Sequence, residues 1–221
     1  MHGFLKEKFM KQFFCIVVAL MIGSFAFAQE TQQAKQVLLS SVTYIQKTPL
    51  KVAFNLAYIN TRTSEKQQKQ GTLLVYGKKF CVTMVDMETF FDGKTQWVFV
   101  PVTNEVTITE PSEQELREIN PLLLVSDCAR THKIVFEENA PENRSLWYIC
   151  LYPLDKLADY FQIKIHLSKK DKSPQYIEIS QKNGDKISFT CTSCMVLQSL
   201  PESTFFFNVK NHPAVEINDL R

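Results

Sequence analysis

The sequence predicts an α+β domain, mostly antiparallel β, in which helices pack against one face of a large sheet. Segments of alternating apolar and polar residues follow one another through much of the 221-residue chain. Hairpin-type turns, such as Asp92-Gly93 and Asn183-Gly184, separate several of them. Helical signals are confined to three places, so the regular exchange of strands and helices that builds a parallel sheet is missing.

The first 28 residues have the features of a cleavable secretory signal. Three lysines within residues 6–11 precede an apolar run that starts at Phe13, and Ala26-Phe27-Ala28 stands before Gln29. The apolar run falls short of the roughly 20 residues that cross a bilayer. We therefore expect a signal peptide over 1–28, with Met1 or Met10 as its start, and a single exported domain over 29–221.

The charge balance argues against nucleic acid as a partner. The chain has 25 basic and 23 acidic residues, and removal of residues 1–28 leaves 22 of each. Phosphate backbones are bound by clusters of Lys and Arg, and none is present. The mature domain is therefore expected to be neutral and to bind no nucleic acid.

The mature chain begins with an amphipathic helix followed by strands. Apolar and small residues recur at helical spacing over Thr31 to Lys47, and Pro49 ends the helix. Lys51 to Asn60 then alternates strictly, which predicts a strand with one apolar face. The polar run Thr61 to Gln70 predicts an exposed loop, either a passive turn or a docking feature. Further strands are expected at residues 72–76, 80–84, 96–101, 105–109, 133–136, 147–151, 162–167, 175–179, 186–192 and 195–200.

Two further segments favour helices. Ser112 and Glu115 have the spacing of a capping box, so a short helix should begin there and end before Pro121. A second, weaker helical pattern covers Pro153 to Phe161.

No pattern for catalysis or for a metal is present. The three histidines of the mature chain, His132, His166 and His212, are scattered rather than arranged at ligand spacing. Asp86 and Glu88 are close in sequence, but they fit a solvated strand end better than an acid/base pair. We expect no enzyme activity and no cofactor.

Five cysteines remain after removal of the signal, an odd number that cannot pair completely in an oxidising compartment. Cys191 and Cys194 have the spacing of a redox dithiol or half a zinc site. They follow a strand rather than open a helix, where a thiolate would be stabilised. Buried thiols and a local redox or disulfide role both remain open.

Large apolar side chains gather on one face of the predicted strands. A sheet with one apolar face needs a cover whether or not it binds a ligand, so the pattern fits a filled core as well as a binding hollow.

Several segments resemble the outer-membrane lipoprotein carrier family, the LolA-like periplasmic chaperones. The hairpin Phe91-Asp92-Gly93-Lys94-Thr95-Gln96-Trp97-Val98-Phe99, followed by Pro101 and Asn104-Glu105-Val106, resembles the centre of the family, and the order of the segments after a secretory signal is the specific part. Supporting segments are Ile119-Asn120-Pro121, residues 174–179 ahead of Asn183-Gly184, and residues 200–207 and 215–221. They occur in order over nearly the whole mature chain.

The resemblance implies a curved, incomplete β-barrel with helices covering its concave face, and a monomeric periplasmic carrier. The carrier would take acylated lipoproteins from an inner-membrane releasing transporter and deliver them to an outer-membrane acceptor, without covalent chemistry. The implied lid residues are Leu116, Ile119, Leu122 and Leu123. The implied lipid-binding residues are Val52, Phe54, Leu56, Tyr58, Phe80, Val82, Met84, Trp97 and Phe99.

Members of the family hold the lid with an arginine on a strand, and this sequence offers no residue that can be matched to it.

Three alternative functions stay open. The same hollow would also suit another lipid or a glycolipid. An envelope thiol-redox protein using Cys191 and Cys194, and a structural protein with a filled core, are the remaining possibilities.

Overall fold

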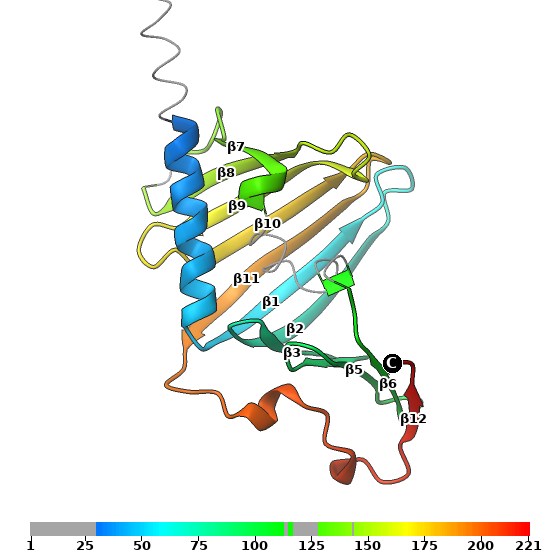
Figure 1. Cartoon of the computed structure of the whole chain (residues 1–221). Coiled ribbons are helices and arrows are strands. Elements are labelled where there is room, and N and C mark those ends of the chain that lie inside the picture. Colours follow the sequence, from blue (N-terminus) through cyan, green and yellow to red (C-terminus); the bar gives the residue numbers. More distant parts are fainter. Residues whose placement is uncertain (1–29, 113–114, 117–127, 143) are drawn as a thin grey trace, which may run out of the picture.

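One open, curved sheet dominates the computed structural model, which describes residues 30–112, 115–116, 128–142 and 144–221 (Figure 1). The sheet has twelve strands in the order β12-β6-β5-β4-β3-β2-β1-β11-β10-β9-β8-β7. Neighbouring strands are antiparallel except for β12, which pairs with β6 in parallel. The expected mostly antiparallel sheet is confirmed.

The strands form two meanders that meet at β1. The first meander runs from β1 to β6, the second runs from β7 to β11, and β11 returns to pair with β1 over its whole length. The strand bounds are β1 Leu50–Ile59, β2 Lys66–Tyr76, β3 Lys79–Met84, β4 Glu88–Phe91, β5 Gln96–Val100, β6 Glu105–Thr109, β7 His132–Phe136, β8 Leu146–Pro153, β9 Tyr160–Ser168, β10 Pro174–Gln181, β11 Lys186–Val196 and β12 Glu216–Asp219.

A long helix over residues 30–47 packs against the sheet near the start of β1 (Figure 1). The side chains at the predicted helical spacing are at most 9% exposed: Ala34, Val37, Leu38, Ser41, Val42 and Ile45. The apolar ones share one hydrophobic cluster with residues of both meanders. The predicted amphipathic helix is therefore confirmed, and its apolar face joins the two halves of the sheet.

The predicted turns form as the sequence requires. Gly93 and Gly184 have φ of 104° and 94°, a region that glycine enters without strain. The Asp92 carboxylate accepts hydrogen bonds from the backbone N–H groups of Lys94 and Thr95, both at 2.8 Å. The capping box also forms, because the Ser112 N–H donates to Glu115 at 2.8 Å.

Two expectations about the elements are wrong, and several short elements were not predicted. Much of the polar run at 61–70 is strand, because β2 begins at Lys66 and pairs with the end of β1. The segment 153–161 is not a helix: it comprises the last residue of β8, the connection 154–159 and the first two residues of β9. The sequence analysis missed β4 and β12, which are only four residues long. The three-residue helix η2 (Val209–Asn211) and the four-residue helix η1 (Glu202–Phe205) were also missed.

We predict that Gly71→Ala destabilises the fold. A Cβ at this position would lie 2.6 Å from Cζ of Phe54 and 2.8 Å from the backbone oxygen of Thr83. Overpacking of this kind costs about 1–3 kcal/mol of unfolding free energy, which urea denaturation measures. Thr72→Ala, at the neighbouring position on the other face, is the control. Equal stability of the two variants would contradict the close approach of Phe54 to this strand.

Candidate functional site

The candidate site is one apolar face of the sheet, centred on β1. Residues paired across neighbouring strands share a face. Phe54 pairs with Gly71 of β2 and Cys191 of β11, and Gly71 pairs with Met84 of β3. We call this face, which also carries the helix 30–47, the inner face. Seven of the nine expected lipid-binding residues lie on it: Val52, Phe54, Leu56, Tyr58, Phe80, Val82 and Met84.

Burial of the inner face changes along β1. Leu50, Val52 and Phe54, nearest the helix, are 1%, 3% and 6% exposed. Leu56 and Tyr58, at the far end of the same strand, are only half-buried, as is Met84 on β3. The inner face is therefore a closed core at the helix end and an accessible apolar surface at the opposite end.

The second meander supplies a large part of the inner face that the sequence analysis did not assign to the site. Phe189 stacks on Phe54 with ring centroids 5.0 Å apart. Fully buried residues of β8, β9 and β10 continue the surface: Ile149, Leu151, Ile163, Ile165, Leu167 and Ile177. Their alternation is visible in the sequence, but the long-range pairing of β11 with β1 is not.

The structure corrects the placement of Trp97 and Phe99. Val82 pairs with Thr89, and Thr89 pairs with Val98, so Val98 lies on the inner-face side of β5. Side chains alternate along a strand, and Trp97 and Phe99 therefore project from the opposite face. The sequence analysis correctly placed Trp97 and Phe99 on one face of β5. Which face of the sheet this is depends on the intervening strand β4, which the sequence analysis missed.

On that opposite face, Trp97 and Phe99 are covered by the C-terminal segment, residues 197–221, which follows β11. Phe99 and Phe207 lie 5.1 Å apart between ring centroids, and Trp97 and Phe206 lie 5.5 Å apart. His212 packs on both Phe99 and Phe207. The cluster comprises Phe90, Trp97, Phe99, Val106, Phe207 and Val215, and we call it the C-terminal cluster.

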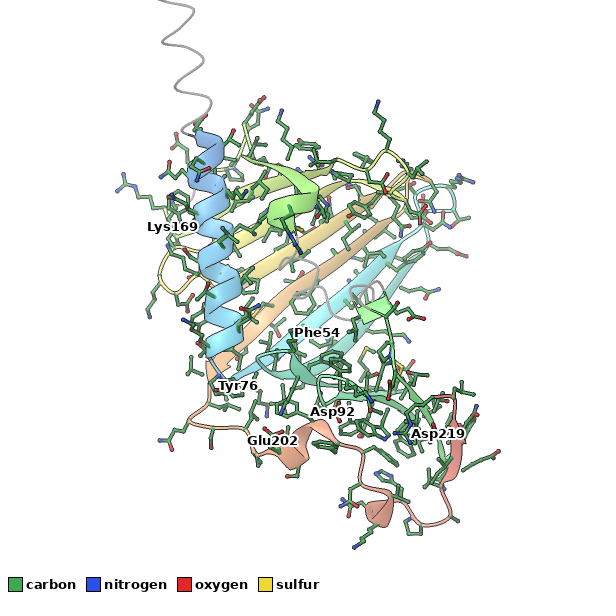
Figure 2. The ribbon with its side chains drawn as sticks, in the orientation of Figure 1. Phe54, Tyr76, Asp92, Lys169, Glu202 and Asp219 are labelled. Atoms are coloured by element: carbon green, nitrogen blue, oxygen red, sulfur yellow. The ribbon has the colours of Figure 1, made fainter. Side chains whose placement is uncertain are left out.

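Side chains in Figure 2 show the separation of the two regions. Phe54 lies on the strands at the centre of the sheet, whereas Glu202 and Asp219 lie on the C-terminal segment that runs past β3 to β6. An ion pair between Lys79 and Glu202 joins this segment to β3. The C-terminal cluster thus has a structural explanation that involves no ligand.

One of the four expected lid residues lies in the described part of the chain. Leu116 is half-buried and packs against the cluster that includes the inner face. Ile119, Leu122 and Leu123 lie outside the described residues.

Asp86 lies in the turn between β3 and β4, and Glu88 is the first residue of β4. Asp86 pairs with Lys69, whose hydrogen bond holds the pKa of that carboxyl below its usual value.

Within the described ranges, no group of three His, Cys, Asp or Glu residues is placed to hold a metal ion. No helix in the same ranges is long and apolar enough to cross a membrane.

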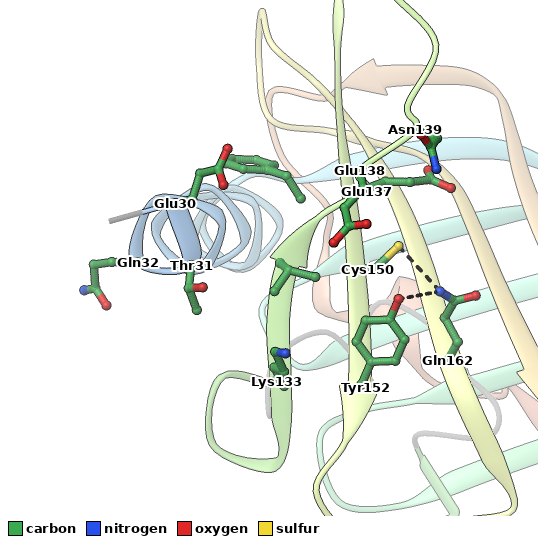
Figure 3. Close-up of a pocket in the computed structure, with 12 residues that line it drawn as sticks. Glu30, Thr31, Gln32, Lys133, Glu137, Glu138, Asn139, Cys150, Tyr152 and Gln162 are labelled. Carbon is green, nitrogen blue, oxygen red and sulfur yellow. Dashed lines mark hydrogen bonds between the residues drawn. The ribbon is translucent and has the colours of Figure 1, made fainter. Parts of the chain in front are cut away.

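A separate pocket of about 980 Å³ lies between the start of the helix 30–47 and strands β7 to β9 (Figure 3). Gln162 donates a hydrogen bond of 3.0 Å to the Tyr152 hydroxyl within it. Carboxylates, amides and Lys133 make up much of its lining, and none of the expected lipid-binding residues does. A hydrocarbon chain would take hydration from these charged groups without offering hydrogen bonds in return, so we do not assign the pocket to acyl chains.

The fold and its apolar face define the class of protein. A family model described as outer membrane lipoprotein carrier protein LolA matches residues 24–136, just over half of the chain. The chain therefore belongs to this family of carrier proteins, which confirms the resemblance seen in the sequence. No curated protein matches the sequence.

A solved structure of an uncharacterized protein supports this fold. An uncharacterized conserved protein from Thermus thermophilus superposes with a TM-score of 0.57 at 12% identity, over 85% of this chain and 99% of that one. A putative outer membrane lipoprotein-sorting protein domain from Vibrio parahaemolyticus has a TM-score of 0.47 at 11% identity, over 79% and 97% of the two chains. LprF from Mycobacterium bovis has a TM-score of 0.45 at 10% identity, over 78% and 97%.

We predict that Phe207→Ala releases the C-terminal segment. Phe207 is 7% exposed and contacts Phe90, Phe99 and His212, so truncation removes the centre of the C-terminal cluster. Loss of a buried Phe costs about 3–5 kcal/mol. Limited proteolysis should then cut residues 201–221, which include the edge strand β12, well before the other eleven strands.

Val209→Ala is the matched control, because Val209 is 45% exposed on the same segment. Exposed substitutions of this kind change stability by no more than about 0.5 kcal/mol. Identical cleavage of the two variants would show that the C-terminal cluster does not anchor the segment.

Proposed function

We propose that this protein is a periplasmic carrier that binds the acyl chains of lipoproteins released from the inner membrane and delivers them to the outer membrane. The observation that carries the proposal is the inner face, an apolar surface shared by both meanders in a chain of the lipoprotein carrier family. Residues 1–28 act as a cleavable signal, residues 29–221 form the single monomeric carrier domain, and the carrier performs no covalent chemistry.

The physical requirement for such a carrier is a dry surface that accepts hydrocarbon and then releases it. Exposed acyl chains cost about 25 cal/mol per Å² in water, so they must be covered during transfer. The half-buried end of the inner face, at Leu56, Tyr58 and Met84, is the entrance. The closed end beneath the helix 30–47 keeps the sheet folded when no cargo is bound.

A cover over the inner face completes the proposed site. The helix 30–47 covers one end of the inner face, and Leu116 packs against the same cluster. Together with Ile119, Leu122 and Leu123, Leu116 forms the lid that opens when acyl chains enter. Trp97 and Phe99 belong to the C-terminal cluster, so we do not include them in the lipid site.

The carrier works between two membrane partners. An inner-membrane transporter releases the acylated lipoprotein to it, and an outer-membrane acceptor receives the cargo. No cofactor takes part, because burial of apolar area alone supplies the affinity.

Release of lipoproteins from spheroplasts tests the proposal. Residues 29–221 added to spheroplasts should bring an acylated lipoprotein into the soluble fraction in complex with the carrier. Leu56→Asp should lower the amount at least tenfold, since ~1.4 kcal/mol corresponds to tenfold in affinity and an uncompensated charge beside hydrocarbon costs more. Leu56 is half-buried, so the substitution should leave the fold intact by circular dichroism.

Asn55→Asp introduces the same charge at the adjacent, equally half-buried position on the opposite face, and it should release normally. Equal loss in both variants would contradict an inner-face site. If the unmodified protein releases no lipoprotein and a different lipid or glycolipid is recovered from it, that molecule is the cargo and lipoproteins are not. Absence of both release and bound lipid would show that the inner face is a filled core.

A further inference from the structure

A β-bulge brings Cys191 and Cys194 to the same side of β11. Residues three positions apart in a regular strand point to opposite faces. Here the register with β1 shifts: Val52 pairs with Cys194, Ala53 with Ser193, and Phe54 with Cys191. Thr192 is left without a partner on β1, which is the arrangement of a bulge. Since Val52 and Phe54 both lie on the inner face, both cysteines lie there too.

The shared face places the two thiols near each other. Both side chains pack against the hydrophobic cluster of the inner face, and each shifts the pKa of the other. Their partners on β1 are two residues apart, about 6.6 Å along a strand. Disulfides join residues whose Cα atoms lie about 4.4–6.8 Å apart, and the spacing of the two partners is compatible with that range.

The two thiols also differ in acidity. The interaction with Cys194 lowers the pKa of the Cys191 thiol, and the same interaction raises the pKa of Cys194. Burial instead raises the pKa of Cys81 to about 11 and also raises that of Cys150. Cys191 is half-buried rather than enclosed, so a reagent in solution can reach it.

We propose that Cys191 and Cys194 form a disulfide across the bulge of β11, made by exchange with a protein or small-molecule disulfide. The Cys191 thiolate attacks one sulfur of the oxidant, which forms a mixed disulfide and releases one thiol of the oxidant. Cys194 then loses its proton and attacks the Cys191 sulfur, which closes the bond and releases the second thiol. Two protein thiols lose two electrons, and the disulfide of the oxidant gains them.

The bond would modify the inner face directly. Cys191 pairs with Phe54, and Tyr44 of the helix 30–47 packs against the same hydrophobic cluster as the two cysteines. Oxidation therefore removes two thiol groups from the surface where the helix meets the sheet, and it fixes the position of the unpaired Thr192.

Peptide mapping tests the proposal without any assay of carrier activity. Trypsin cleaves after Lys186 and Lys210, and the peptide 187–210 contains Cys191 and Cys194 but no other cysteine. Folded protein is treated with oxidised glutathione, alkylated under denaturing conditions with iodoacetamide and digested. We expect this peptide without alkyl groups and lighter by two hydrogens, and we expect reduction before alkylation to give the doubly alkylated form.

Two variants separate the proposed exchange from general oxidation. Cys194→Ser should stop the reaction at the first step, so that Cys191 accumulates as the mixed disulfide with glutathione. Cys81→Ser, which removes a buried thiol on another strand, should leave the cross-link unchanged. Alkylation of both Cys191 and Cys194 after oxidation, or glutathione attached to both, would overturn the proposal.

Discussion

Antiparallel pairing of β1 with both β2 and β11 is the constraint on which the rest of the structure depends. This strand joins two meanders that are each continuous in sequence, and its register decides which side chains of both face the helix 30–47. A slip of one residue would move every side chain of β1 to the other face. Gly71 shows how closely this register is defined, because the ring of Phe54 occupies the space where its side chain would be.

The same register sorts the apolar residues into two groups with different roles. The inner face is closed under the helix and accessible at its far end, which suits a surface that must stay folded while it exchanges cargo. The C-terminal cluster is covered by residues of its own chain, including Phe206 and Phe207. Proteins often use separate elements for stability and for binding, since sites that open belong to the less stable parts of a fold.

Local patterns in the sequence predicted the helix, most strands and the turns at Gly93 and Gly184, because each depends on neighbouring residues. They also placed Val52, Phe54, Leu56 and Tyr58 on one face. They failed for Trp97 and Phe99, where the face depends on a four-residue strand without a clear signal of its own. They also could not show that Cys191 and Cys194 share a face, since the bulge is visible only in the pairing with β1.

Photo-crosslinking with a fatty acid that carries a diazirine on its hydrocarbon tail tests the central claim most directly. Adducts located by tandem mass spectrometry should fall on inner-face residues of β1, above all on Leu56 and Tyr58. An excess of unlabelled fatty acid should suppress them. Adducts concentrated on Trp97 and Phe99, or in the separate pocket beside β7, would contradict the account, as would labelling that unlabelled fatty acid does not reduce.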